Sequence, residues 1–250
     1  FSSFVGTKHA FATSSALGAL DISAMLCQFQ EGDEVICPAH TYAASAYPFA
    51  KYGAKIVWAD INADTFVIDL NQIEKVFTPK TKAIIVVHLY GLPANMHEIM
   101  QFAKDKNILV IEDCAQAIGA TINQSQVGSF GDIGVFSFQS HKNISTLGEG
   151  GMITTNNDAF ATLIPGLRHN GHKPYNRPDP NYYWLPAMVN LDFDISNIWP
   201  DNYCLGEVQC ALGNQMIKRV DQIIKVRKER FHKFKEAFAN MPIKIQEIPE

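Results

Sequence analysis

The sequence lacks the signatures of nucleic-acid-binding and membrane proteins. Its 250 residues carry a formal net charge of -4 and contain no polybasic run, whereas non-specific binding to nucleic acid requires a basic surface. The longest apolar stretch, around Ala83 to Val87, is far too short to cross a bilayer. We therefore expect neither a nucleic-acid partner nor a membrane partner.

Cysteine is sparse and lacks the spacing of a disulfide or redox motif. The five cysteines are an odd number and include no Cys-x-x-Cys pair. This pattern favours buried, unpaired thiols in a reducing compartment over a disulfide framework. The sequence thus predicts a cytoplasmic protein.

Several enzyme motifs are also missing. Neither Gly-x-x-x-x-Gly-Lys nor Gly-x-Gly-x-x-Gly occurs, so a nucleoside triphosphatase or a dinucleotide enzyme is not supported. A serine hydrolase is not supported either, because Gly-x-Ser-x-Gly is absent. His169 and His172 are the closest non-adjacent histidines, and without a neighbouring carboxylate or thiolate they predict no metal site.

The chain does contain a regular alternation of strand-like and helix-like segments. We expect strands at 9–13, 34–37, 55–59, 82–88, 108–113, 133–138 and 151–155, and helices at 15–29, 41–52, 70–77, 94–106 and 157–167. The strands are continuous apolar runs, typical of a parallel sheet with both faces covered. The fold class predicted is α/β, with a mostly parallel seven-stranded sheet between helices and ligands at the carboxyl ends of the strands.

The alternation stops after Gly171. An aromatic, proline-rich segment follows as far as Pro200, and a loop of this length is usually functional or interfacial. One long helix is expected over 205–238 and a strand over 243–245. We expect residues 1–225 to form a large domain with a truncated N-terminus, because the chain opens at Phe1 inside a structured element. Residues 226–250 would end a linking helix and begin a truncated smaller domain.

Two residues at predicted strand ends point to a particular chemistry. Lys142 follows the apolar run 134–138, and Asp113 closes the run 108–113. Pyridoxal phosphate (PLP) requires such a pair, because the lysine forms a Schiff base with the cofactor aldehyde and the acid keeps the pyridine nitrogen protonated. Taken alone, Lys142 would be a solvated surface lysine; Asp113 and the glycines at 148–151 favour the cofactor.

A phosphate site is predicted between the first strand and the first long helix. Ser15, Ala16 and Leu17 stand there, and the first backbone N–H groups of a helix are unpaired and attract phosphate. A plain serine N-cap would explain the same segment. Ser137, on the strand that leads to Lys142, could add a hydroxyl to that phosphate.

Two further side chains could touch the cofactor ring. Tyr42 follows a predicted strand end and could stack on an aromatic ring, although a core aromatic would give the same pattern. Gln116 lies one turn past Asp113, within reach of a cofactor oxygen.

Together these segments resemble the large domain of the PLP-dependent nucleotide-sugar aminotransferases, the DegT/StrS type of fold type I. The resemblance covers nearly the whole chain, and its motifs occur in order and at matching spacing. The motifs are Gly32-Asp33-Glu34-Val35-Ile36, Pro38-Ala39-His40-Thr41-Tyr42, Val87-His88-Leu89-Tyr90-Gly91, Glu112-Asp113-Cys114-Ala115-Gln116-Ala117, and Phe136-Ser137-Phe138 through Lys142-Asn143 to Gly148-Glu149-Gly150-Gly151.

The resemblance assigns a role to each candidate. It makes Lys142 the Schiff-base lysine and Asp113 the partner of the pyridine nitrogen. Ring stacking is then assigned to Tyr42, the cofactor hydroxyl to Gln116, and the phosphate to Ser137 with the amides of Ala16 and Leu17. Asn202 resembles an asparagine that reaches the cofactor phosphate of the neighbouring subunit, which implies a homodimer with shared active sites.

The chain departs from the family pattern at three places. Ala16-Leu17 stands where Gly-Thr or Gly-Ser is usual, so phosphate binding there depends on main-chain N–H groups. Cys204 replaces a frequent arginine or lysine. Gln139 stands where histidine is common, three residues before the lysine, which puts the handling of the substrate in doubt.

The function implied is transfer of an amino group, from glutamate, to a nucleotide-linked keto-sugar, in the biosynthesis of cell-envelope polysaccharide. One alternative is a PLP-dependent sugar dehydratase on the same fold, a branch in which histidine usually replaces the lysine; Lys142 favours transamination. Another is a non-catalytic regulatory homologue, since a fold does not fix a function.

Overall fold

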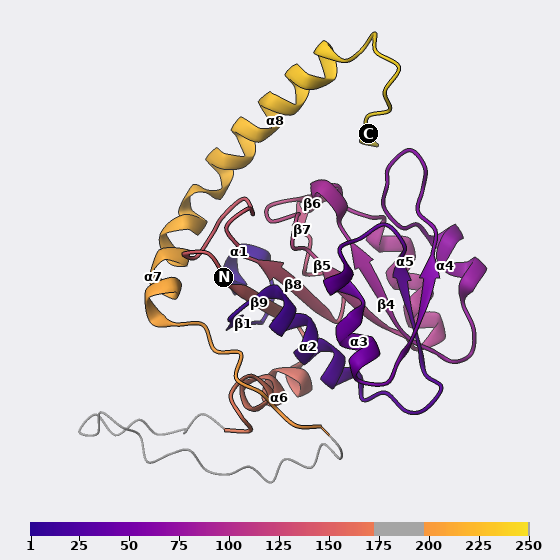
Figure 1. Cartoon of the computed structure of the whole chain (residues 1–250), viewed down its shortest axis with the longest axis vertical. Coiled ribbons are helices and arrows are strands. Elements are labelled where there is room, and N and C mark those ends of the chain that lie inside the picture. The colour runs from indigo at the N-terminus through magenta and orange to yellow at the C-terminus, as the bar shows by residue number, and fades with distance from the viewer. Residues whose placement is uncertain (173–197, 250) are drawn as a thin grey trace.

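The computed structural model describes residues 1–172 and 198–249. Its main element is a seven-stranded sheet with the order β1-β9-β8-β5-β4-β2-β3 (Figure 1). The strands are β1 (His9–Thr13), β2 (Glu34–Pro38), β3 (Lys55–Ala59), β4 (Thr81–Val87), β5 (Leu109–Asp113), β8 (Ile133–Ser137) and β9 (Gly151–Thr155), and a separate hairpin joins β6 (Thr121–Ile122) to β7 (Ser125–Gln126).

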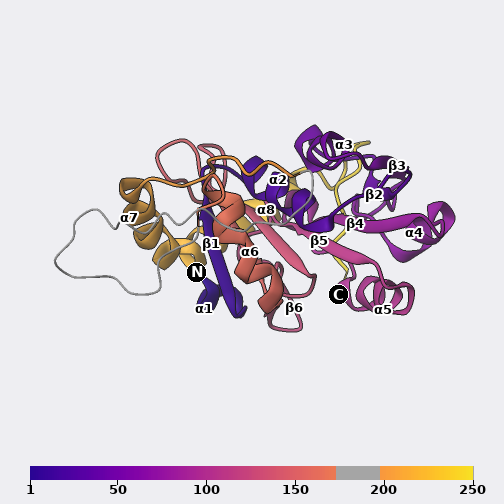
Figure 2. The same ribbon diagram turned by 90° about the horizontal axis from the view of Figure 1, so that it is seen from below.

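Helices cover both faces of this sheet. In Figures 1 and 2, α2 and α3 lie on one face, whereas α4 and α5 lie on the other. The helices are α1 (Ser2–Val5), α2 (Ala16–Cys27), α3 (Tyr47–Lys51), α4 (Leu70–Val76), α5 (Met96–Lys106), α6 (Asp158–Arg168), α7 (Glu207–Met216) and α8 (Val220–Ala237), with short 3-10 turns η1 (Ala43–Ser45), η2 (Leu89–Gly91) and η3 (Ile217–Arg219).

The predicted sheet is confirmed in strand number and in its mostly parallel pairing. Strands β3, β2, β4, β5 and β8 pair in parallel, whereas β9 runs antiparallel to both β8 and β1. The central strands are buried throughout: Ala83 to Val86 have no exposed surface. Each such aliphatic side chain contributes about 1.5–3 kcal/mol when it leaves water, so the sheet forms a rigid platform for the loops at its ends.

Two predicted helices are broken in the structure. The helix expected at 41–52 is the 3-10 turn η1 followed by α3, whose second residue is Pro48; proline lacks an N–H and fits best in the first turn of a helix, so α3 begins there. The single helix expected at 205–238 is α7 and α8, joined by η3. No glycine or proline marks that junction, so the sequence pattern did not reveal it.

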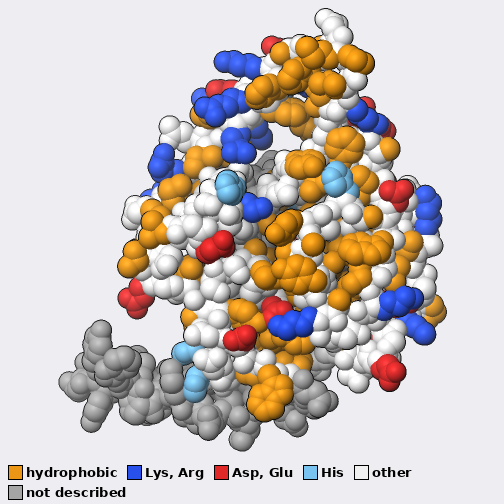
Figure 3. Space-filling model, in the orientation of Figure 1, with side chains coloured by type: hydrophobic (Ala, Val, Ile, Leu, Met, Phe, Trp, Pro, Cys, Tyr) orange, Lys and Arg blue, Asp and Glu red, His pale blue; other side chains and the backbone are white. Residues whose placement is uncertain are grey.

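The predicted strand at 243–245 is wrong. Those residues form no strand, and the extended segment that contains them lies against the loop around Asp64 instead. The backbone N–H of Glu247 donates to the Asp64 carbonyl over 2.9 Å, and Gln246 donates through Nε2 to the Thr65 carbonyl over 2.7 Å. Helix α8 leads away from the sheet before the chain returns to this loop (Figure 1), and Figure 3 shows an opening between them.

Helix α1 and the β6–β7 hairpin were not predicted. Both are short, and a pattern of four residues or fewer carries no periodicity. No helix among the described residues combines the length and the hydropathy that crossing a bilayer requires.

Candidate active site

The candidate residues gather at one edge of the sheet, where parallel strands end together. Asp113 is the last residue of β5; it lies in register with Val135 of β8 on one side and with Val87 of β4 on the other. Lys142 follows β8, and Tyr42 follows β2, the next strand beyond β4. The carboxyl edge of an α/β sheet is where ligands bind, so topology groups residues that lie up to 100 positions apart in sequence.

Asp113 is held by two hydrogen-bond donors. Its side chain is buried at 6 % exposure. The Ser45 hydroxyl donates to Oδ2 over 2.7 Å, and the Ala115 backbone N–H donates to Oδ1 over 3.0 Å. A carboxylate offers about four lone pairs, so two acceptor positions remain for a further donor such as a protonated ring nitrogen.

The charge of Asp113 acts on the Cys37 thiol. Burial raises the pKa of the Cys37 thiol far above its usual range, and the negative charge of Asp113 raises it further. Cys37 is therefore neutral, and it is not a competing anion beside the site.

Lys142 lies in a broad loop that joins β8 to β9. Its backbone N–H donates to the Gln139 carbonyl over 2.9 Å, and the loop is pinned by Ser140 N–H to Gly148 O and by Phe138 N–H to Gly150 O. The side chain of Lys142 is half-buried, and within the described ranges no hydrogen bond or ion pair engages its ammonium group. Gln139 closes the loop further, because its Oε1 accepts the His141 N–H over 2.8 Å.

The predicted phosphate cradle has the geometry of a capped helix start. Ser15 is the N-cap of α2, and its hydroxyl accepts the Gly18 N–H over 3.0 Å. Within the described residues, the N–H groups of Ala16 and Leu17 have no protein acceptor. A Cβ built at Gly151 would lie 2.4 Å from the carbonyl of Ser15. Only glycine lets β9 approach this closely, and the approach holds the helix start beside the strand.

Ser137 and Gln116 both have protein partners at this edge. The Ser137 hydroxyl is 7 % exposed and accepts a long hydrogen bond, 3.4 Å, from the Gln139 N–H. Gln116 accepts the Tyr90 N–H through Oε1 over 2.7 Å, which leaves its NH₂ group as a donor. Tyr42 is 76 % exposed, so the alternative of a core aromatic is wrong.

Asn202 lies in a short segment that crosses the start of α2. The Tyr203 carbonyl accepts the Ser14 N–H over 2.7 Å, and the Tyr203 hydroxyl donates to the buried carboxylate of Asp21. The side-chain oxygen of Asn202 accepts the Cys204 N–H over 3.1 Å. The aromatic loop predicted ahead of this segment lies mostly outside the described residues.

A buried hydrogen-bond network that was not predicted includes Glu112, the residue before Asp113. Glu112 and His88, both without exposed surface, are joined by a 3.0 Å hydrogen bond. The Nδ1 atom of His88 accepts the Ala94 N–H over 3.1 Å, so the ring proton is on Nε2 and is donated to Glu112. The carboxylate also accepts three backbone N–H groups, from Gly128, Phe130 and Gly131. The alternation of apolar residues gave no signal for this network.

The same network contains the one grouping of three metal-type ligands among the described residues, which is His88, Glu112 and Cys114. Both ring nitrogens of His88 and both oxygens of Glu112 are already engaged. Burial and, to a smaller extent, the nearby carboxylates raise the pKa of the Cys114 thiol well above its usual range, and metals bind the thiolate. The cluster is therefore a structural hydrogen-bond network.

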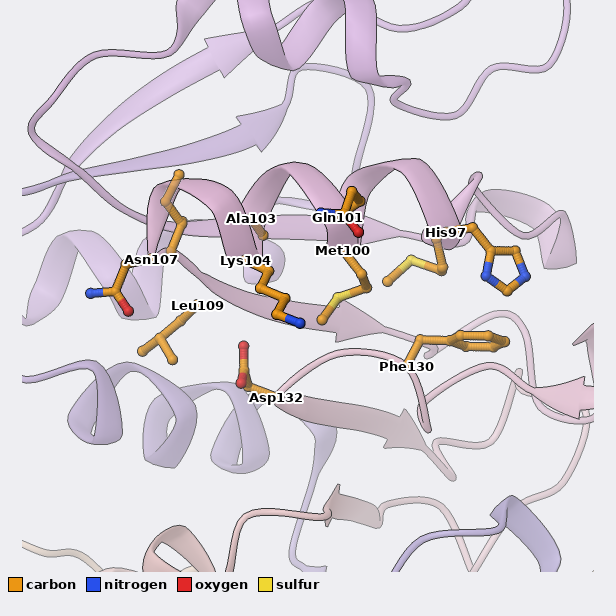
Figure 4. Close-up of a pocket in the computed structure, with 11 residues that line it drawn as sticks. His97, Met100, Gln101, Ala103, Lys104, Asn107, Leu109, Phe130 and Asp132 are labelled. Carbon is orange, nitrogen blue, oxygen red and sulfur yellow. The ribbon is translucent and has the colours of Figure 1, made fainter.

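A cavity of about 530 Å³ lies at the opposite edge of the sheet. It is lined by residues of α5 together with Leu109 and Asp132, which stand at the amino ends of β5 and β8. Lys104 and Asp132 point toward one another across it (Figure 4). The cavity is not part of the candidate site, because it lies far from the strand ends that carry Asp113 and Lys142.

Comparison with known proteins gives a consistent result. The model of the DegT/DnrJ/EryC1/StrS aminotransferase family matches residues 1–250. The chain is 40% identical over 227 residues to GDP-perosamine synthase of Caulobacter vibrioides, which covers 91% of the chain and 57% of that protein. It is 45% identical over 166 residues to UDP-N-acetyl-3-dehydro-alpha-D-glucosamine 3-aminotransferase of Acidithiobacillus ferrooxidans, covering 66% of the chain and 45% of the relative. The chain thus spans about half the length of these relatives.

Solved structures show the same fold. An aminotransferase from Psychrobacter cryohalolentis superposes with a TM-score of 0.77 at 35% identity, over 88% of this chain and 54% of that one. The E. coli GDP-4-keto-6-deoxy-D-mannose-3-dehydratase with bound hydrated PLP superposes with a TM-score of 0.83 at 29% identity, over 99% of this chain and 66% of that one. The predicted fold type I architecture is confirmed.

Proposed function

The chain belongs to the DegT/DnrJ/EryC1/StrS aminotransferase family, and on that premise we propose that it binds PLP and transfers an amino group from glutamate to a nucleotide-linked keto-sugar. One observation carries the proposal: Asp113 ends β5 and Lys142 comes after the adjacent parallel strand β8, at the edge where such sheets bind ligands. The names of the two sugar-modifying relatives support the substrate class.

The residues present fit the cofactor. PLP, when bound, supplies an electron sink that stabilises negative charge on the carbon being deprotonated. Asp113 would accept a hydrogen bond from the ring nitrogen, because two lone pairs of its carboxylate remain beside the bonds from Ser45 and Ala115. The N–H groups of Ala16 and Leu17 hold the phosphate in the cradle that Gly151 makes possible, with Ser15 and Ser137 beside it.

Three further side chains have groups available to contact the cofactor. Tyr42, largely exposed at the strand edge, stacks on the ring, and the NH₂ group of Gln116 donates to the ring hydroxyl. Lys142 would be the residue that holds the cofactor covalently. Its amine would also be the general base and acid that moves the proton at the reacting carbon.

The dehydratase alternative has a structural basis, because a sugar dehydratase is among the solved structures with this fold. Retention of Lys142 supports the aminotransferase. A dehydratase site would use a group that cannot hold the cofactor covalently, whereas an intact lysine in the β8–β9 loop can.

Assembly and location belong to the same proposal. We infer a homodimer in which Asn202 reaches the partner's cofactor. Exposed apolar side chains around the candidate site, among them Leu17, Tyr47 and Leu147, support a buried interface there. The five free cysteines support a reducing, cytoplasmic location, and the boundary proposed between the large domain and the residues from 226 onward falls within α8.

Reductive trapping tests the function. Borohydride reduction of the holoenzyme should fix the cofactor to the peptide that contains Lys142, and Lys142→Ala should abolish turnover while the protein still binds PLP non-covalently. Lys75→Ala, which removes an exposed lysine of α4, is the control and should behave as wild type. Trapping on a different lysine would overturn the assignment, and full turnover by Lys142→Ala would overturn the mechanism.

Mixing of subunits tests the shared site. A dimer of one Asn202→Ala subunit and one Lys142→Ala subunit has both lesions in one site and neither in the other. About half of wild-type activity per dimer should then return, because a two-fold dimer carries two equivalent sites. No recovery after demonstrated exchange of subunits would mean that Asn202 acts within its own chain or not at all.

A further inference from the structure

Ser45 is a buried hydroxyl to which no role has been assigned. Its side chain is 2 % exposed. It lies at the end of η1, the turn that begins at Tyr42, and its backbone N–H donates to the Tyr42 carbonyl over 2.9 Å. Its Oγ atom contacts two polar groups, Asp113 Oδ2 at 2.7 Å and Thr41 Oγ1 at 2.8 Å.

The direction of these hydrogen bonds follows from proton counting. An ionised carboxylate can only accept, and a serine hydroxyl has one proton. Ser45 therefore donates its proton to Asp113, so the bond between the two hydroxyls is donated by Thr41 and accepted by Ser45. The result is an ordered relay, from Thr41 to Ser45 to Asp113, that runs from the turn of Tyr42 to the carboxylate.

We propose that Ser45 and Thr41 are positioning residues that orient the Asp113 carboxylate as the acceptor for the nitrogen of the cofactor ring; the inference rests on the proposed function. A donor to a carboxylate stabilises the anion. When a ring nitrogen faces Asp113, the nitrogen and the carboxylate share one proton. The hydrogen bonds from Thr41 and Ser45 favour the state in which this proton is on the nitrogen. Polarisation along a chain of hydroxyls strengthens the last bond.

Of the side chains near Asp113, Ser45 and Thr41 supply this stabilisation. The second donor, the Ala115 N–H, is part of the backbone and cannot be varied by a side chain. The neighbouring thiol, Cys37, is neutral because burial raises its pKa. Glu112 points its carboxylate to His88 and to the 128–131 loop, not to Asp113. The same two hydroxyls also hold the turn that starts at Tyr42. Thr41 and Ser45 therefore position both Tyr42, which would stack on the face of the ring, and Asp113, which would meet the ring nitrogen.

The test measures the protonation of the bound ring directly. Holoenzyme is prepared with PLP that carries ¹⁵N at the ring nitrogen, and its chemical shift is recorded together with the dissociation constant of PLP and with kcat. In Ser45→Ala the shift should move toward the unprotonated value, and kcat should fall about ten- to a hundredfold, the range for one hydrogen bond to a charged group. Thr41→Val should change the ¹⁵N shift in the same direction by a smaller amount. Thr41→Ser keeps the hydroxyl and should show the wild-type shift.

Ser23→Ala is the matched control. Ser23 is a fully buried serine whose hydroxyl donates within α2 to the Ala19 carbonyl over 2.8 Å. Ser23→Ala removes a buried hydroxyl oxygen, as Ser45→Ala does, but none of the contacts of Asp113. The ¹⁵N chemical shift of the bound ring should therefore stay at the wild-type value.

The outcomes separate the two proposals. A wild-type protein that binds no PLP, or that binds it with an unprotonated ring, overturns the proposed function itself. A protonated wild-type ring whose shift is unchanged in Ser45→Ala overturns the relay and leaves the function standing. If Ser45→Ala does not fold, the comparison of Thr41→Val with Thr41→Ser decides, because Thr41 is only half-buried.

Discussion

The substitution Glu112→Gln should be among the most destabilising single changes in this protein. The Glu112 carboxylate accepts four hydrogen bonds: His88 Nε2–H and Gly128 N–H on one oxygen, and Phe130 N–H and Gly131 N–H on the other. A glutamine has one oxygen and one NH₂ group. In either orientation of the amide, two donors then face an NH₂ group that is itself a donor.

The magnitude follows from that count. Hydrogen bonds to a charged group contribute about 1.5–3 kcal/mol each, so two lost bonds cost about 3–6 kcal/mol. Water cannot compensate, because the side chains of Glu112 and His88 have no exposed surface. A single domain is stable by about 5–15 kcal/mol, so the loss approaches the lower end of that range.

Glu34→Gln is the matched control. Glu34 is also a buried glutamate, but its donors are the Thr78 hydroxyl and the exposed ammonium of Lys55. A hydroxyl can rotate and an exposed lysine can return to water, so the cost should be about 0.5–1.5 kcal/mol.

The assay is urea unfolding followed by tryptophan fluorescence, with the free energy of unfolding extrapolated to water and the m-value checked for constancy. If the two variants lose free energies that agree within about 1 kcal/mol, the spread of single hydrogen bonds, the backbone contacts of Glu112 do not stabilise the fold as argued.

Three further changes have defined outcomes. Gly151→Ala should lose about 1–3 kcal/mol of stability by overpacking and weaken PLP binding, because the new Cβ meets the backbone of Ser15; unchanged PLP affinity would contradict the cradle. Burial raises the pKa of Asp132, so this carboxyl group binds its proton more tightly in the folded protein than in the unfolded chain. The free energy of unfolding therefore increases as the pH falls through the pKa that Asp132 has in the folded state. Asp132→Asn should therefore raise the unfolding free energy at pH 7 and lose that advantage below about pH 4, near the usual aspartate pKa; equal shifts at both pH values would contradict this. Tyr203→Phe removes a donor to the buried Asp21 and should cost about 1.5–3 kcal/mol in urea unfolding, whereas a neutral result would show that Lys51 and the Tyr52 hydroxyl satisfy that carboxylate without Tyr203.

The elements with long, regular patterns were predictable. Strand β4 is a run of apolar residues, and α5 repeats its apolar residues at helical spacing; both appear at the expected places, with ends displaced by two residues at most. The predictions failed where a pattern was short or uninterrupted. The hairpin β6–β7 has two residues per strand, and the junction of α7 and α8 contains no residue that breaks a helix.

The candidate site divides in the same way. Lys142 and Asp113 could be selected from sequence because each follows an apolar strand and each has a chemistry that its position requires. Ser45 could not be selected: a serine in a turn has no sequence signal, and its importance depends on Asp113, which is 68 residues distant in the chain.

The sequence by itself determined the layered α/β architecture, because alternating apolar segments can bury their surfaces only as a sheet between helices. It also determined which residue types stand at the strand ends. The tertiary structure decided which of those ends are neighbours, since the strand order β9-β8-β5-β4-β2 is set by packing and not by position in the chain. It alone decided the hydrogen-bond partners of Asp113 and Glu112, because such contacts join segments that come together only when the sheet is complete.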